Sequence, residues 1–130
     1  MKFVHTSGRR KRSIARATLN DGIGIIRINS KLLDNYQPVL SRMKIMEPLI
    51  LTPELSKKVN IDIDVRGGGY QSQTDAIRLA IARALVQYSK DKSLRQKFLE
   101  YDRHLIIADT RRAEPSKPND SKPRKARQKS

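Results

Sequence analysis

The chain has 130 residues, enough for a single domain with a modest core, and a formal charge of +15 at pH 7. It contains no cysteine, which excludes a disulfide framework and a thiolate metal site. The two histidines, His5 and His104, match no metal-ligand spacing, so no metal or cofactor is expected. No apolar run has the length of a signal peptide or a transmembrane helix, which favours an intracellular, soluble protein.

The positive charge is concentrated at the two ends of the chain. Residues 1–16 hold six lysines and arginines and no acid, and residues 111–130 hold eight against two acids. Each segment therefore carries +6, which leaves only +3 for the 94 residues between them. A nearly balanced body with two basic segments favours a polyanionic partner, with nucleic acid ahead of a membrane surface.

The first part of the chain predicts short strands. Residues 3–5 favour a strand that Ser7-Gly8 interrupts. Residues 14–19 and 23–28 flank Asn20-Asp21-Gly22, which is typical of the turn in a β-hairpin. Alternation within this hairpin predicts a core-facing set and an outward-facing set: Ala15, Ala17, Leu19, Ile26 and Ile28 face the core, and Arg16 and Arg27 face outward.

Residues 30–58 lose this alternation. The apolar side chains within 32–36 predict one or two helical turns. A second apolar segment, residues 40–50, has helical spacing that Pro48 limits. Residues 54–58 form a polar connector to the next strand.

The most strongly patterned stretch follows. Residues 59–66 alternate apolar and polar side chains, which predicts a half-buried strand. After Gly67–Gly69 the apolar period becomes helical up to Tyr88, and Ser72 followed by Asp75 is a helix-start signal.

Two arginines of this helix, Arg78 and Arg83, are predicted to lie off its apolar face. Further along, Ser93 with Gln96 predicts a capping box for a shorter helix. That helix is expected to bury Leu94, Phe98 and Leu99, and residues 105–107 provide a last apolar anchor.

Beyond Thr110 the chain has no apolar periodicity. Three prolines and a strongly positive net charge predict that this segment cannot form a core by itself. Fully extended, its twenty residues span up to roughly 65 Å. We therefore expect a globular domain at 1–110 and an extended basic tail at 111–130.

Enzyme chemistry is disfavoured by the residues present. The triple glycine lacks the spacing and the lysine of a nucleotide-hydrolysing loop. It either permits positive φ at a tight turn or offers backbone N–H groups to a phosphate, and both roles are compatible. Asp62 and Asp64 share a strand face but have no partner acid or histidine, so they are interpreted as a solvated face.

The four consecutive cations at residues 9–12 adjoin a predicted strand. A charge run is often only a solvated face, but this one is matched by a second basic segment at the other end of the chain. Arginine binds phosphate through two parallel hydrogen bonds, and lysine adds point charge. Aromatic residues are few, which argues against a base-stacking sheet. Recognition through phosphates, sugars and RNA shape is therefore predicted.

Three motifs resemble one family. They are Gly8-Arg9-Arg10-Lys11-Arg12-Ser13-Ile14-Ala15-Arg16, the block at 67–85 with Gly-Gly-Gly, Gln-Thr-Asp-Ala-Ile-Arg and Ile-Ala-Arg-Ala-Leu, and Asp109-x-Arg111 with Glu114 and the closing Lys-Ala-Arg-Gln-Lys-Ser. In this order they resemble small-subunit ribosomal protein nine, and the N-terminus and ending are closer to archaeal and eukaryotic members.

The resemblance implies an α+β fold of two layers, with about four strands and helices on one side, like the second domain of ribosomal protein five. It implies a structural, non-enzymatic role in the cytoplasmic ribosome, with binding to the 3′ major domain of small-subunit rRNA in the subunit head. It also implies neighbouring head proteins as partners and a tail directed toward the peptidyl-site tRNA.

The resemblance also implies RNA contacts, which fall into three groups. The N-terminal group is Arg9, Arg10, Lys11, Arg12 and Arg16, the central group is Gly67, Gly68, Gly69, Gln73, Arg78 and Arg83, and the tail group is Arg111, Arg124, Lys125, Arg127 and Lys129. The other cations of the basic tail, Arg112, Lys117 and Lys122, are also expected to contact RNA. Family tails usually end in arginine, whereas this sequence ends at Ser130. Either two residues are missing or Lys129 and Ser130 are the tRNA-proximal residues.

Two other functions are compatible with the sequence. An RNA-processing factor, such as the basic protein partner of a catalytic RNA, can share this architecture and would be released from ribosomes into a small ribonucleoprotein. A nucleotide-binding enzyme would use the triple-glycine turn and would bind ATP or GTP. The ribosomal interpretation is preferred because the motifs extend over nearly the whole chain.

Overall fold

The computed structural model describes residues 3–106, apart from the side chain of His104. Five strands form one mixed sheet in the order β1-β2-β5-β3-β4. The strands are β1 (Phe3–Arg10), β2 (Ser13–Asp21), β3 (Ile26–Ile28), β4 (Lys31–Leu32) and β5 (Val59–Arg66). Neighbouring strands are antiparallel except β3 and β5, which run parallel. The fifth strand beyond the expected four is the two-residue β4.

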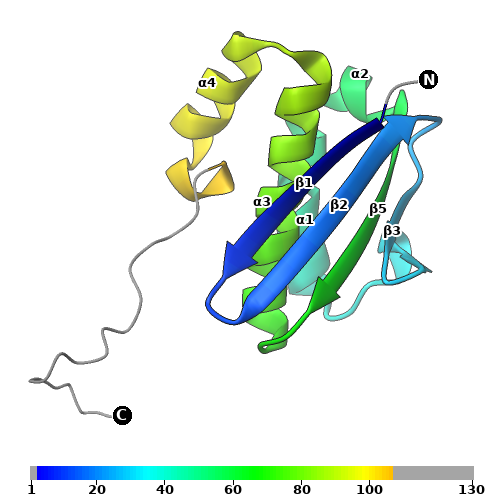
Figure 1. Ribbon diagram of the computed structural model, residues 1–130, viewed down its shortest axis with the longest axis vertical. Helices are drawn as coiled ribbons and strands as arrows, with labels where there is room; N and C mark the ends of the chain where they lie inside the picture. Colours follow the sequence, from blue (N-terminus) through cyan, green and yellow to red (C-terminus); the bar gives the residue numbers. More distant parts are fainter. Residues whose placement is uncertain (1–2, 107–130) are drawn as a thin grey trace, which may run out of the picture.

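The helices form the second layer of the fold. They are the 3₁₀ turn η1 (Leu33–Asn35), α1 (Val39–Ile50), α2 (Pro53–Ser56), α3 (Tyr70–Ser89), α4 (Lys92–Tyr101) and the 3₁₀ turn η2 (Arg103–Leu105). Figure 1 shows α1 and α3 on one side of the sheet, with no described helix on the other side. The two-layer α+β architecture is thus confirmed for the described residues.

The core lies between the helix-facing side of the sheet and α3, which packs mainly on β1 and β2 and less on β5. Ile61 and Ile63 of β5 are buried in this core, as are Ile77, Ile81 and Leu85 of α3. Each large apolar side chain that is removed from water contributes about 1.5–3 kcal/mol. The strand from Val59 to Arg66 has the bounds that its alternation predicts.

The expected hairpin between residues 14–19 and 23–28 is wrong. β3 pairs with β5 instead of β2, and β2 lies between β1 and β5. The side chain of Asn60 explains the difference, because its Oδ1 accepts hydrogen bonds from the backbone N–H groups of Ile23 and Ile25, each at 3.0 Å. These bonds hold the loop after β2 against β5. The predicted core faces are nevertheless correct, because the alternation within each strand is independent of its partner.

The expected interruption at Ser7-Gly8 is also wrong, because β1 runs unbroken through both residues. Gly8 faces α3, and an added Cβ would lie 2.2 Å from the carbonyl oxygen of Ala76 and 2.8 Å from the nitrogen of Ala80. Glycine is therefore required here for the close approach of strand and helix and does not mark a turn.

Both helix starts differ from the expected ones. α3 begins at Tyr70 after Gly69, so Ser72 lies within its first turn and does not cap it. In α4 the cap is Asp91, whose carboxylate accepts a hydrogen bond from the Ser93 N–H at 2.9 Å. Among the expected core positions at the end, Leu105 and Ile106 are buried, and residue 107 lies outside the described residues, as does the predicted tail at 111–130.

The substitution Gly8→Ala tests the strand–helix approach. We expect it to lower the free energy of unfolding by about 3 kcal/mol, because backbone atoms of α3 cannot move away from the added methyl group without a shift of the helix. Urea denaturation followed by circular dichroism measures this change. The control is Gly69→Ser, which meets no atom within 4 Å and should stay within about 0.5 kcal/mol of the original chain. Equal effects of the two substitutions would contradict the prediction.

Candidate nucleic-acid interface

The two motifs predicted to contact RNA meet at one end of the sheet. The Ser13 hydroxyl at the start of β2 donates a hydrogen bond to the Gly67 carbonyl at 2.8 Å. A Cβ on Gly67 would lie 2.4 Å from the Arg12 carbonyl oxygen, and one on Gly68 would lie 2.2 Å from the Ser13 hydroxyl. The glycine turn therefore lies directly on the turn between β1 and β2, and it brings the start of α3 next to the basic run.

Both turn glycines also have left-handed backbone angles. The φ values are +80° for Gly67 and +67° for Gly68. Glycine adopts these angles without the steric cost of a Cβ. Gly67 and Gly68 thus have the predicted backbone role, which is to permit positive φ at a tight turn. Gln73, expected as an RNA contact, donates from Nε2 to the Gly67 carbonyl at 3.0 Å and so supports the same turn.

The first turn of α3 is open to an anion. Gly69 at the N-cap provides no side-chain hydrogen bond to the helix, so α3 begins without a side-chain cap. The first N–H groups of a helix lack intrahelical partners, and the helix dipole places partial positive charge there. Gly67–Gly69 are exposed, so solvent or a ligand has access to this end of the helix. The arrangement suits a phosphate beside the basic turn.

The basic run divides between the two faces of the sheet. Lys11 and Arg12 are exposed at the β1–β2 turn, and Arg9 is exposed on the face opposite the helices. Arg10 points to the helix side, where its Nε lies 3.5 Å from Asp75 of α3. Asp75 also pairs with Lys44 at 3.4 Å. Three of the four cations are thus directed to solvent, and Arg10 is held against α3.

The open face of the sheet carries further arginines. Arg16 lies there opposite Asp64 in the β2–β5 register. Arg9 and Arg66 share one row of the sheet, separated by Ile14 of β2, which places them about 10 Å apart. Arg66 was not among the expected contacts, although its parity in β5 indicates that it faces away from the core. Its side chain is 80% exposed and lies 3.5 Å from Asp64.

Arg78 is buried between helices, whereas the helical pattern predicts that it lies outside the apolar face of α3. Its side chain is only 6% exposed, and its Nη2 lies 2.5 Å from Glu47 of α1 and 2.9 Å from Asp102 after α4. Arg78 therefore joins α1, α3 and the end of α4. The helical period missed this because an arginine with two carboxylate partners can be buried, and those partners are distant in the sequence.

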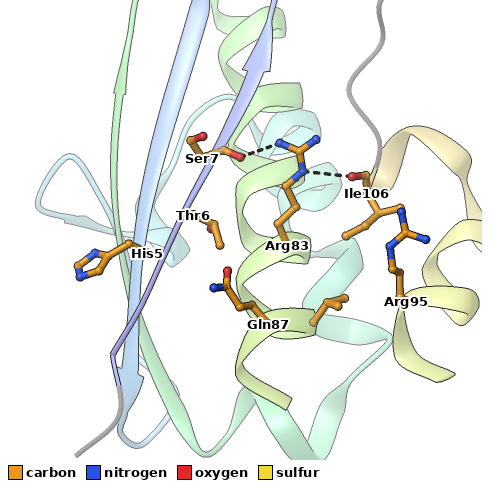
Figure 2. A pocket seen from close by; sticks show the side chains of 8 residues that line it. His5, Thr6, Ser7, Arg83, Gln87, Arg95 and Ile106 are labelled. Atoms are coloured by element: carbon orange, nitrogen blue, oxygen red, sulfur yellow. Dashed lines mark hydrogen bonds between the residues drawn. The ribbon is translucent and has the colours of Figure 1, made fainter. Parts of the chain in front are cut away.

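Arg83 also contacts the protein's own backbone. Its Nη1 donates to the Ser7 carbonyl at 3.0 Å and its Nε donates to the Ile106 carbonyl at 3.2 Å (Figure 2). Burial lowers the pKa of the Arg83 guanidinium from its ordinary value, yet arginine stays charged at neutral pH. Arg83 thus ties β1 to the segment after α4.

The structure describes only some of the other residues singled out in the sequence. The tail set lies outside the described residues: Arg111, Arg112, Lys117, Lys122, Arg124, Lys125, Arg127, Lys129 and Ser130. Asp62 and Asp64 are exposed on the sheet, as predicted. Within residues 3–106 no cluster of acids and histidines is suited to a metal ion, and none of the helices there could cross a bilayer.

An end of the molecule with exposed cations around an uncapped helix start is typical of a protein that binds a polyanion. The family described as ribosomal protein S9/S16 matches residues 8–130. Small ribosomal subunit protein uS9 of Methanococcus maripaludis is 50% identical over 132 residues, which cover 100% of this chain and 98% of that protein. Its namesake from Methanococcus vannielii is 48% identical with the same coverage. The chain therefore belongs to the ribosomal protein S9 family.

Family membership confirms the resemblance that the motifs indicate. Both of these relatives come from archaea, in agreement with the expected archaeal or eukaryotic-like form. As a member of this family, the protein is a structural component of the ribosome and not an enzyme.

The buried ion pairs of Arg78 predict a role in stability. Arg78→Met should lower the free energy of unfolding by about 2 kcal/mol, because Glu47 and Asp102 lose their partner. This is less than the 3–5 kcal/mol typical of a fully buried pair, since both carboxylates keep some exposure to water. Denaturation measurements check this. The exposed Arg12 is the control, and Arg12→Met should change stability by less than about 0.5 kcal/mol. A stable Arg78→Met chain would contradict the assignment.

Proposed function

We propose that this protein is a structural constituent of the small ribosomal subunit that binds rRNA of the head, in the 3′ major domain. The observation that carries the proposal is the contact of the glycine turn with the basic turn. It places Lys11 and Arg12 of the basic turn beside the start of α3 at one end of the fold, with Arg9 exposed at the same end on the open face of the sheet. The names of the uS9 relatives assign those proteins to the small ribosomal subunit, which supports the same location for this chain.

The chemistry of this end favours the phosphate backbone over the bases. Arginine side chains bind phosphate oxygens with two donors, and backbone N–H groups at a helix start add donors of fixed direction. Tyr70 is exposed next to the glycine turn, but the described sheet face has only Phe3 as an exposed aromatic. Recognition of one fixed RNA shape through phosphates and sugars fits this composition.

The architecture supports a finer assignment of fold and partners. A mixed sheet with helices on one face fits the second domain of ribosomal protein five, and we assign this chain to that fold group. The basic tail at 111–130 is proposed to pass through rRNA so that Lys129 and Ser130 approach the anticodon arm of the peptidyl-site tRNA. Neighbouring head proteins complete the set of partners.

A matched pair of double substitutions tests RNA binding at the basic turn. Lys11→Gln with Arg12→Gln removes two exposed cations at this end, and Lys57→Gln with Lys58→Gln removes two exposed cations just before β5, at the other end of the sheet. With a transcript of the 3′ major domain, the first pair should flatten the slope of log K against log salt by about 1.5 units. The second pair should leave it nearly unchanged. Equal slopes would mean that the basic turn is only a solvated surface.

The tail assignment has a separate test. A photo-crosslinker at position 129 in reconstituted small subunits with peptidyl-site tRNA should react with the anticodon arm. The same group at position 58 should not. Crosslinks from position 129 to rRNA alone would remove tRNA from the list of partners and leave the rRNA-binding role in place.

A further inference from the structure

A second positively charged surface lies along the free edge of the sheet. β1 is an edge strand, and a groove of about 640 Å³ runs between it, α3 and α4. Ser7, Arg83, Gln87 and Arg95 line it with Ile106, as Figure 2 shows. This groove is distinct from the basic turn, because Arg83 lies roughly 20 Å along α3 from the start of the helix at Tyr70.

The charge in this groove is not compensated by the described residues. Arg83 projects from α3 and Arg95 from α4, and no carboxylate is among the lining residues. Within residues 3–106 neither guanidinium forms an ion pair, and the two known partners of Arg83 are neutral carbonyls. The imidazole of His5 points away from the groove in Figure 2, so the two arginines supply its charge.

Arg83 is held in place before any ligand arrives. Its bonds to Ser7 and Ile106 use Nη1 and Nε, so the planar guanidinium is fixed and keeps Nη2 for another acceptor. A donor whose direction is already set loses little side-chain freedom on binding. Arg95 is exposed and lines the same groove from the α4 side.

The groove is poorly suited to an added β-strand, the usual partner of a free sheet edge. The Ser7 carbonyl of β1 is already bonded to Arg83, and the Thr6 hydroxyl donates to the Ala80 carbonyl of α3 at 2.8 Å. An added strand would therefore have to displace Arg83 from the Ser7 carbonyl at this part of the edge. An anion that needs only guanidinium donors fits better than a peptide backbone that needs a free strand edge.

We propose that the groove between β1, α3 and α4 is a second RNA-binding site, in which Arg83 and Arg95 together bind a backbone phosphate. The proposal rests on the RNA-binding function proposed above and extends it to a separate surface. Arg95 is a contact residue that the sequence motifs do not indicate, and Arg83 has a double role, since it holds β1 to the segment after α4 and presents Nη2 to the ligand.

The test compares two exposed cations of the same helix. Arg95→Gln removes a groove cation, and Lys92→Gln removes one that does not line the groove. The full chain is titrated with a protein-free transcript of the 3′ major domain at several KCl concentrations. We expect Arg95→Gln to flatten the slope of log K against log salt by about 0.7–0.9 units and Lys92→Gln to leave the slope unchanged. Circular dichroism establishes that both variants are folded.

A second pair of variants adds a negative charge instead of removing a positive one. Gln87→Glu places a carboxylate in the groove, and Gln96→Glu places one on the exposed surface of α4 outside it. Only Gln87→Glu should weaken binding of the same transcript, by an amount comparable to Arg95→Gln.

The outcomes separate this proposal from the general function. If the original chain binds the transcript with a steep salt slope but Arg95→Gln matches Lys92→Gln, the groove is not an RNA site, although the protein still binds rRNA. An acidic protein partner would then be the candidate for the groove. If the original chain shows no salt-dependent binding at all, the RNA-binding function itself fails.

Discussion

Gly67 and Gly68 let the chain leave β5 and enter α3 while it lies against the backbone of Arg12 and Ser13. Their positive φ angles and the absence of side chains are both necessary, because a Cβ at either position would overlap that backbone or the Ser13 hydroxyl. This contact joins the most regular unit of the chain, β5 with α3, to the most basic one, the β1–β2 turn. It holds the β1–β2 turn, with Lys11 and Arg12, beside the start of α3.

The arginines of this protein serve two physical purposes. Arg78 is buried between two carboxylates and holds three helical segments together, while Arg83 ties β1 to the segment after α4 through two carbonyls. Lys11 and Arg12 instead stand in water with no described ion pair, where their charge is available to a ligand. Burial determines which purpose applies, because a desolvated charge is retained only with partners, whereas an exposed charge keeps its hydration until a phosphate replaces it.

The two basic surfaces of the folded domain lie at different positions along α3. The basic turn lies at one end of α3 and the groove with Arg83 and Arg95 lies farther along the same helix, so α3 connects the two surfaces. A rigid helix of twenty residues holds them at a constant separation. In the proposed function, these two surfaces bind phosphates at a fixed distance and so select an RNA by its shape, without reading a base sequence.

The local sequence determined the strand from Val59 to Arg66, the helix after it, the core faces of β2 and β3 and the segregation of charge, because each follows from a short period or from composition. Only the tertiary structure decided that β5 lies between β2 and β3, since strand order depends on distant contacts such as those of Asn60. The same holds for Gly8 and Arg78. Neighbours that are distant in the sequence determine whether a glycine interrupts a strand or allows a helix to pack closely on it. They also determine whether an arginine is exposed to water or buried between two carboxylates.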